Sequence, residues 1–123
     1  MGKTVLVVDD SSTMRQMVAY TLTTAGYEVV EAGNGKEAVG KLTGGAKPVL
    51  VVTDLNMPEM DGITLITEIR KMAAFKFIPI LMLTTESSDD KKKAGQAAGA
   101  TGWIVKPFNP EQMLKVIQKV LPA

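Results

Sequence analysis

The chain has 123 residues, 46% of them hydrophobic and 22% charged, which suits one globular domain with its own core. Its formal net charge of +1 gives no electrostatic case for binding to nucleic acid or to a membrane surface. The chain contains no cysteine and no histidine, so disulfides, zinc–thiolate sites and imidazole catalysis are excluded. No apolar run has membrane-spanning length and the N-terminus leads directly into an apolar run, so we expect a cytoplasmic protein.

Five short apolar runs, most of them rich in β-branched residues, predict five β-strands. They are 5–8, 27–30, 49–52, 78–83 and 103–105. Three of them lack alternation between apolar and polar residues, which is typical of parallel strands covered on both faces.

The segments between these runs have the period of amphipathic helices. The predicted helices run from a cap at Ser11 or Ser12 to Gly26, through 38–42 to a stop at 44–45, over 63–72, over about 87–98, and from Asn109–Pro110 to Leu121. The fourth is the weakest of them, because it is poor in apolar residues and contains Gly95. Strand followed by helix, five times over, predicts a doubly wound α/β domain with a parallel sheet and helices on both faces.

Polar residues follow the predicted strands at the ends where such sheets bind their ligands. Asp9 and Asp10 follow the first strand, and Asp54 follows the third. Thr84 ends the fourth strand and Lys106 follows the fifth. Each of these residues alone would be interpreted as a helix cap, a turn residue or a surface side chain. Because all of them fall at one edge of the sheet, we expect them to converge.

Three close carboxylates and one lysine carry a summed charge of −2, which a divalent cation would neutralise. Oxygen ligands without histidine or cysteine favour Mg²⁺, with Mn²⁺ as a substitute. A carboxylate can attack phosphorus and form an acyl phosphate. Lys106 and Thr84 are suited to neutralise or hydrogen-bond the phosphoryl oxygens.

Four segments in this order resemble the receiver domains of bacterial two-component systems. They are VLVVDDSSTMR, VVTDLNMPEMDG, ILMLTTES and GWIVKPF. The resemblance runs from Lys3 to the last helix and implies one receiver domain over 1–123. It also implies a flavodoxin-like, CheY-like fold with five helices and a sheet of five parallel strands in the order 2-1-3-4-5.

The resemblance implies a role for each acidic residue. Asp54 matches the phosphoacceptor of the family. Asp10, Asp54 and the backbone carbonyl of Asn56 match its Mg²⁺ ligands, and Asp9 matches the acid that orients metal-bound water.

The resemblance also assigns the residues that respond to phosphorylation. Lys106 would pair with the phosphoryl group and precede a cis peptide bond with Pro107, while Thr84 would move toward the phosphate. In the family a Tyr or Phe at this position swings inward as the Thr moves toward the phosphate, and this chain has Trp103 there. The larger ring and the N–H group of Trp103 can restrict or alter that swing.

Two variable positions that tune dephosphorylation are occupied by Asn56 and Glu86, a pair similar to that of CheY-type chemotaxis receivers. Met14 and Arg15 resemble the same subgroup. The resemblance therefore favours a diffusible chemotaxis messenger that catalyses only its own phosphorylation and dephosphorylation.

The implied partners are proteins. A histidine kinase would supply the phosphoryl group, a phosphatase would be a further partner, and a target such as the flagellar motor switch would bind the monomer. By family precedent the target binds the face formed by the fourth helix, the fifth strand and the fifth helix. The basic and aromatic residues expected there are Lys91, Lys92, Trp103, Lys115 and Lys119.

Three alternatives remain at this stage. A single-domain phosphorelay intermediate or phosphate sink would share every residue of the site. A flavodoxin-like electron carrier would use Ser11–Thr13 as a phosphate loop, but Asp9 and Asp10 would repel that phosphate. An aspartate-nucleophile phosphatase would need a second acid two residues after the nucleophile on the first strand, where this chain has adjacent acids.

Overall fold

The structure is a computed structural model that describes residues 3–55, 60–84, 89–105 and 109–121. The strands, all parallel, are β1 (Thr4–Val8), β2 (Glu28–Ala32), β3 (Leu50–Asp54), β4 (Ile80–Thr84) and β5 (Gly102–Val105). They form one sheet in the order β2-β1-β3-β4-β5, which confirms the predicted topology.

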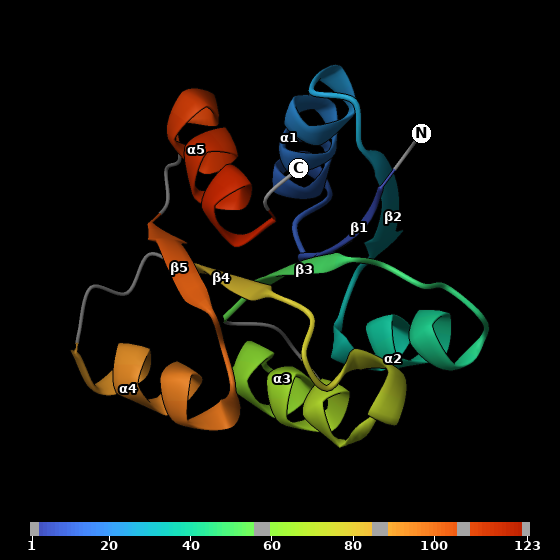
Figure 1. The fold of residues 1–123 in the computed structure, drawn as a ribbon, viewed down its shortest axis with the longest axis vertical. Coiled ribbons are helices and arrows are strands. Elements are labelled where there is room, and N and C mark those ends of the chain that lie inside the picture. The colour runs from blue at the N-terminus through green and yellow to red at the C-terminus, as the bar shows by residue number, and fades with distance from the viewer. Residues whose placement is uncertain (1–2, 56–59, 85–88, 106–108, 122–123) are drawn as a thin grey trace.

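The helices cover both faces of this sheet. They are α1 (Ser12–Thr24), α2 (Gly35–Thr43), α3 (Gly62–Lys71), α4 (Asp89–Ala98) and α5 (Pro110–Val120), with a short 3₁₀ helix, η1 (Ala73–Phe75). Figure 1 shows α1 and α5 on one face, and α2, α3 and α4 on the other. In the described part of the chain, no helix combines the length and the apolar content needed to cross a membrane.

Burial on both sides of the sheet produces two core clusters. Val5, Val7 and Val52 pack with α1 and α5, whereas Leu6, Val8 and Val51 pack with α2 and α3. This division follows from the alternation of side chains along a strand. All residues of β3 and β4 are buried, as the uninterrupted apolar runs predicted.

Side-chain caps confirm the predicted starts of α1 and α5, and they show that α2 begins at Gly35 rather than near Ala38. The side chains of Ser11, Asn34, Asp61 and Asn109 each accept a hydrogen bond from a backbone N–H of the first turn. These caps satisfy donors that have no partner within the helix. They therefore fix the residue at which the chain leaves each loop.

All five strands differ from the prediction by one or two residues at one or both ends. β2 continues to Ala32, β3 includes Asp54, and β4 begins at Ile80 rather than at 78. Asp54 belongs to the strand because it pairs in register with Leu83, so polarity alone does not end a strand whose backbone is still paired. The helix η1 was not predicted.

Helix α4 continues through Gly95 without a break. A Cβ atom at this position would collide with the Sδ and Cε atoms of Met82. The glycine that weakened the sequence prediction therefore allows the helix to approach β4 closely.

Arg70, near the end of α3, connects this helix to the segment before β4 and to the residue that follows α4. Its guanidinium donates to the carbonyls of Phe75, Lys76 and Ile78 at 3.2, 3.1 and 2.6 Å, and to that of Gly99 at 3.1 and 2.7 Å. Burial lowers the pKa of Arg70 from its usual value. The side chain thus fixes the entry to β4 and the end of α4.

Replacing Arg70 by Ala is expected to lower the free energy of unfolding by about 2–3 kcal/mol, because several carbonyls lose a charged donor. Urea denaturation followed by circular dichroism measures this loss. The neighbouring, exposed Lys71 is the matched control, since its ion pair with Glu68 at 3.1 Å is worth under about 1 kcal/mol. Equal losses for Arg70→Ala and Lys71→Ala would contradict the connecting role.

Candidate functional site

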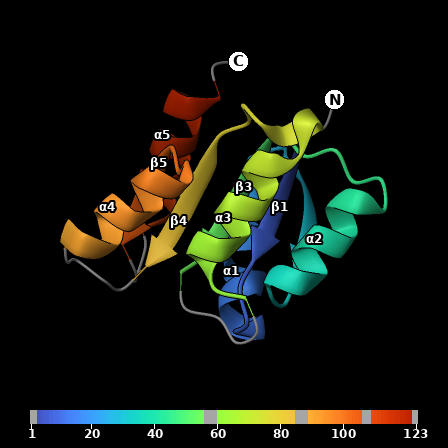
Figure 2. The same ribbon diagram turned by 90° about the horizontal axis from the view of Figure 1, so that it is seen from below.

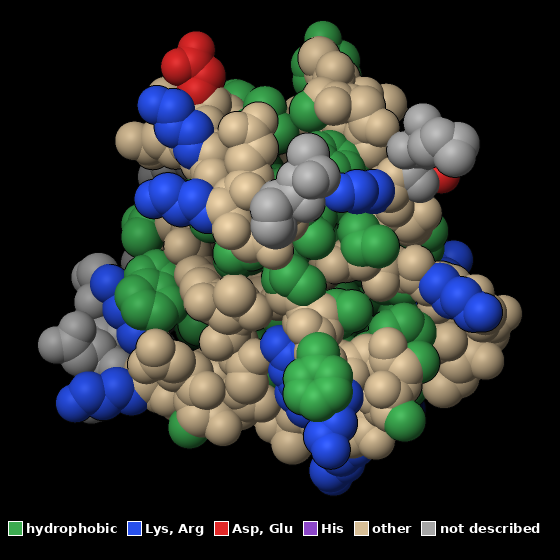
Figure 3. Space-filling view, viewed as in Figure 1, with side chains coloured by type: hydrophobic (Ala, Val, Ile, Leu, Met, Phe, Trp, Pro, Cys, Tyr) green, Lys and Arg blue, Asp and Glu red, His purple; other side chains and the backbone are tan. Residues whose placement is uncertain are grey.

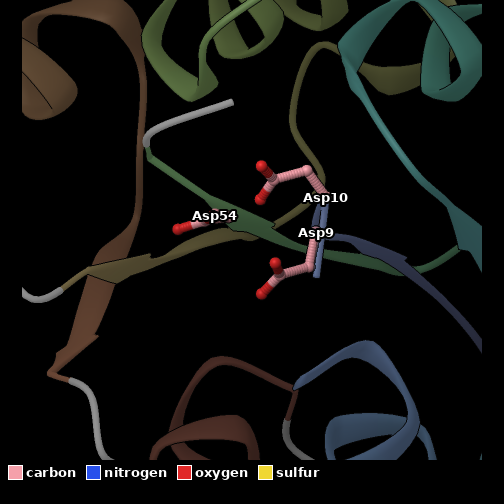
Figure 4. A group of neighbouring side chains, drawn as sticks. All are labelled: Asp9, Asp10 and Asp54. Carbon is pink, nitrogen blue, oxygen red and sulfur yellow. The ribbon is translucent and has the colours of Figure 1, made fainter. Parts of the chain in front are cut away.

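Three carboxylates meet at the carboxyl ends of β1 and β3. Asp9, Asp10 and Asp54 each offer an oxygen, and these oxygens all lie within 4.8 Å of one another. Figure 2 shows the arrowheads of β1 and β4 at the same edge of the sheet, and Figure 4 shows the three side chains together there. The predicted convergence of these acids is confirmed.

Asp9 is held in place by its own loop and by α1. Its side chain is fully buried, and its Oδ1 accepts a hydrogen bond from the Ser11 N–H at 2.9 Å. Its backbone carbonyl accepts a hydrogen bond from Nη1 of Arg15 at 2.7 Å, and Nε of Arg15 binds Glu31 at 3.0 Å. The sequence singled out Arg15 only by family resemblance, and its link to Asp9 was not predicted.

Asp54 is 7% exposed and ends β3. Its Oδ1 accepts a hydrogen bond from the Leu55 N–H at 2.9 Å, and its carbonyl accepts one from Oγ1 of Thr53 at 3.0 Å. Gly62 lies directly against this backbone, because a Cβ atom there would collide with the Asp54 carbonyl oxygen. The sequence did not predict this close approach.

Thr84 lies at the end of the strand next to Asp54. It is 2% exposed and follows Leu83, the register partner of Asp54. Val105 pairs with Thr84 across β4 and β5. The remaining predicted site residues, Asn56, Glu86 and the Lys106–Pro107 bond, lie outside the described residues.

The donor set fits a hard divalent cation. The possible ligands are carboxylate oxygens of Asp9 and Asp54, whose side chains are buried, and of Asp10, whose side chain is exposed. Negative charge is therefore concentrated at a place that solvent can reach through Asp10. Such oxygens are the ligands that Mg²⁺ prefers, and Mg²⁺ keeps room for water and for phosphoryl oxygens. By contrast, Lys and Arg predominate among the charged side chains on the face shown in Figure 3.

A second surface feature lies between β5 and α5. A groove of about 370 Å³ is lined by Trp103, Ile104, Val105, Gln112, Lys115 and Val116. Most of the lining side chains are apolar, and Lys115 contributes a cation. The groove belongs to the face on which the sequence predicted Trp103 and Lys115.

Comparison with known proteins gives consistent matches. The model of the response regulator receiver domain family matches residues 5–118. The chemotaxis protein CheY1 of Helicobacter pylori is 45% identical over 117 residues, which are 94% of each chain. The phosphate regulon transcriptional regulatory protein PhoB of Pseudomonas aeruginosa is 38% identical over 98% of this chain and 52% of its own length. The structure of chemotaxis protein CheY4 of Vibrio cholerae has a TM-score of 0.94 and 51% identity, and the match covers 98% of this chain and all of that one.

The fold and the acidic cluster thus define a two-component signalling domain of the CheY-like type. The chain belongs to the response regulator receiver domain family. Receiver domains bind Mg²⁺ at an acidic pocket and interact with histidine kinases and downstream targets. The predicted family and fold are therefore confirmed.

Proposed function

We propose that the protein is a phosphorylation-activated messenger, in which a histidine kinase transfers a phosphoryl group to Asp54 and the modified protein then binds a target. The observation that carries this proposal is the Asp9–Asp10–Asp54 cluster at the carboxyl ends of β1 and β3. The two chemotaxis proteins to which the chain is similar support a role in chemotaxis, with the flagellar motor switch as a candidate target.

In the proposed reaction a carboxylate oxygen of Asp54 attacks phosphorus. The new O–P bond makes an acyl phosphate, while the P–N bond of the phosphohistidine breaks and the leaving imidazole takes up a proton. Asp54 is oriented for this attack by the hydrogen bond that its Oδ1 accepts from the Leu55 N–H at 2.9 Å. When bound by Asp10, Asp54 and the carbonyl of Asn56, Mg²⁺ supplies neutralisation of the phosphoryl charge.

The other predicted residues have supporting roles in this proposal. Lys106 would pair with the phosphoryl group, and Thr84 would hydrogen-bond it from the adjoining strand end. Asn56 and Glu86 would set the rate of hydrolysis by positioning water.

The signal would leave through α4, β5 and α5. The groove beside Trp103 supports this part of the proposal, because an apolar groove with a cation at its edge suits a peptide with an apolar anchor and an acidic residue. Lys92 and Lys119 add positive charge to the same elements, whereas the Lys91 side chain lies outside the described residues.

Millimolar Mg²⁺ is expected to raise the melting temperature by roughly 5 °C, because it binds the folded acidic cluster and relieves carboxylate repulsion. Differential scanning calorimetry at constant ionic strength measures the shift. The Asp10→Asn variant should lose most of it. An equal shift with Na⁺ alone would show general salt screening in place of a site.

Transfer from a small phosphodonor tests the phosphorylation step on which the proposal depends. Incubation with phosphoramidate and Mg²⁺ should add one phosphoryl group per chain, which intact-mass spectrometry detects. Chelation of Mg²⁺ by EDTA should suppress the addition. Failure of the Mg²⁺-loaded protein to take up a phosphoryl group would refute the proposed function.

A further inference from the structure

Lys92 of α4 rests on the aromatic ring of Trp103 in β5. The Nζ atom lies 5.0 Å from the ring centroid, within the range in which a cation is attracted to the face of an indole. Both side chains are half-buried, so water screens this attraction less than it would at a fully exposed position. Trp103 also packs against the core cluster on the α2–α4 face of the sheet.

A second contact fixes the same helix one turn further on. Gly95 lies against the side chain of Met82, and Met82 is the register partner of Trp103. Residues three apart on a helix share one face, so Lys92 and Gly95 both face the sheet. Helix α4 thus contacts two neighbouring side chains of the sheet, Met82 of β4 and Trp103 of β5.

Trp103, which contacts α4 through Lys92, is also one of the residues that line the groove between β5 and α5. A shift of α4 that displaced Trp103 would therefore change the lining of the groove.

We infer that Lys92 is a positioning residue, which holds the indole of Trp103 by a cation–π contact and so couples the placement of α4 to the shape of the groove. Its consequence for signalling rests on the proposed function, since the groove lies on the proposed output face. The positioning role itself does not rest on the proposed function.

The chain contains one tryptophan, so tryptophan fluorescence reports on Trp103 alone. Lys92→Gln removes the cation and retains a long side chain, whereas Lys92→Arg retains the cation. We expect Lys92→Gln to raise the acrylamide quenching constant of the folded protein about twofold, while Lys92→Arg stays near the wild-type value. Lys93→Gln, at the next and exposed position, is the matched control and should not change quenching.

Unchanged quenching in Lys92→Gln would overturn the inference, since packing alone would then hold the ring. Equal increases in Lys92→Gln and Lys92→Arg would overturn it as well, because the charge would not be responsible. These measurements are made without Mg²⁺ or a phosphodonor, so they remain valid whether or not Asp54 is the acceptor.

A final measurement separates the coupling from the proposed function. Mg²⁺ with beryllofluoride should shift the emission of the wild-type protein, and the shift should shrink at least about twofold in Lys92→Gln. An identical shift in both proteins would refute the coupling. Lack of any shift in the wild-type protein, while quenching still depends on Lys92, would count against the proposed function and leave the positioning role in place.

Discussion

Replacing Asp54 by Asn is expected to reduce labelling by phosphoramidate by at least about 100-fold, because an amide oxygen is a poor nucleophile toward phosphorus. The substitution keeps the shape of a residue that is 7% exposed and retains an oxygen that can accept the Leu55 N–H. It also removes one of three clustered negative charges, so the protein should remain folded. Intact-mass spectrometry measures the labelling, and circular dichroism checks the fold.

Asp61→Asn is the matched control for this experiment. Asp61 caps α3, its Oδ1 accepting the Thr64 N–H at 2.8 Å, and Asn caps a helix about as well as Asp. The same chemical change at this position should therefore leave labelling intact. Continued labelling of Asp54→Asn at the wild-type rate would place the phosphoacceptor elsewhere in the chain.

Replacing Gly62 by Ala is expected to lower the free energy of unfolding by about 2–3 kcal/mol, or roughly 10 °C in melting temperature. The added Cβ atom would meet the Asp54 carbonyl oxygen and would lie 3.0 Å from Cα of Leu55. These are backbone atoms at the end of the strand that carries the proposed acceptor, so the added Cβ atom can be accommodated only if Asp54 moves. Phosphorylation of the folded fraction should slow for the same reason.

The control variant Gly40→Ala is expected to change the free energy of unfolding in the opposite direction. Gly40 lies inside α2 and is exposed, and no heavy atom lies within 4 Å of an added Cβ. Alanine should therefore stabilise the protein by about 1 kcal/mol through its helix propensity. Urea denaturation of both variants separates the two effects. A loss of stability in Gly40→Ala comparable with that in Gly62→Ala would show that contact with Asp54 is not the cause.

Local sequence patterns were sufficient to predict the order of the elements and the edge of the sheet at which the acids meet. Apolar runs and helical periods follow from local burial, and the caps at Ser11 and Asn109 depend on residues next to them. Parallel strands have their carboxyl ends at one edge of the sheet, so the proximity of Asp9 and Asp54 could be predicted from the sequence. The resemblance to receiver domains then assigned their roles.

The ends of the strands and the contacts between distant side chains depend on how the whole chain packs. Asp54 belongs to β3 because it pairs with Leu83, and no local property of Asp indicates that pairing. Likewise, Arg70 meets a carbonyl 29 residues away, and Lys92 meets Trp103 on another element. Such contacts depend on how whole elements pack, because periodicity reveals which face of an element is buried but not which atoms it meets.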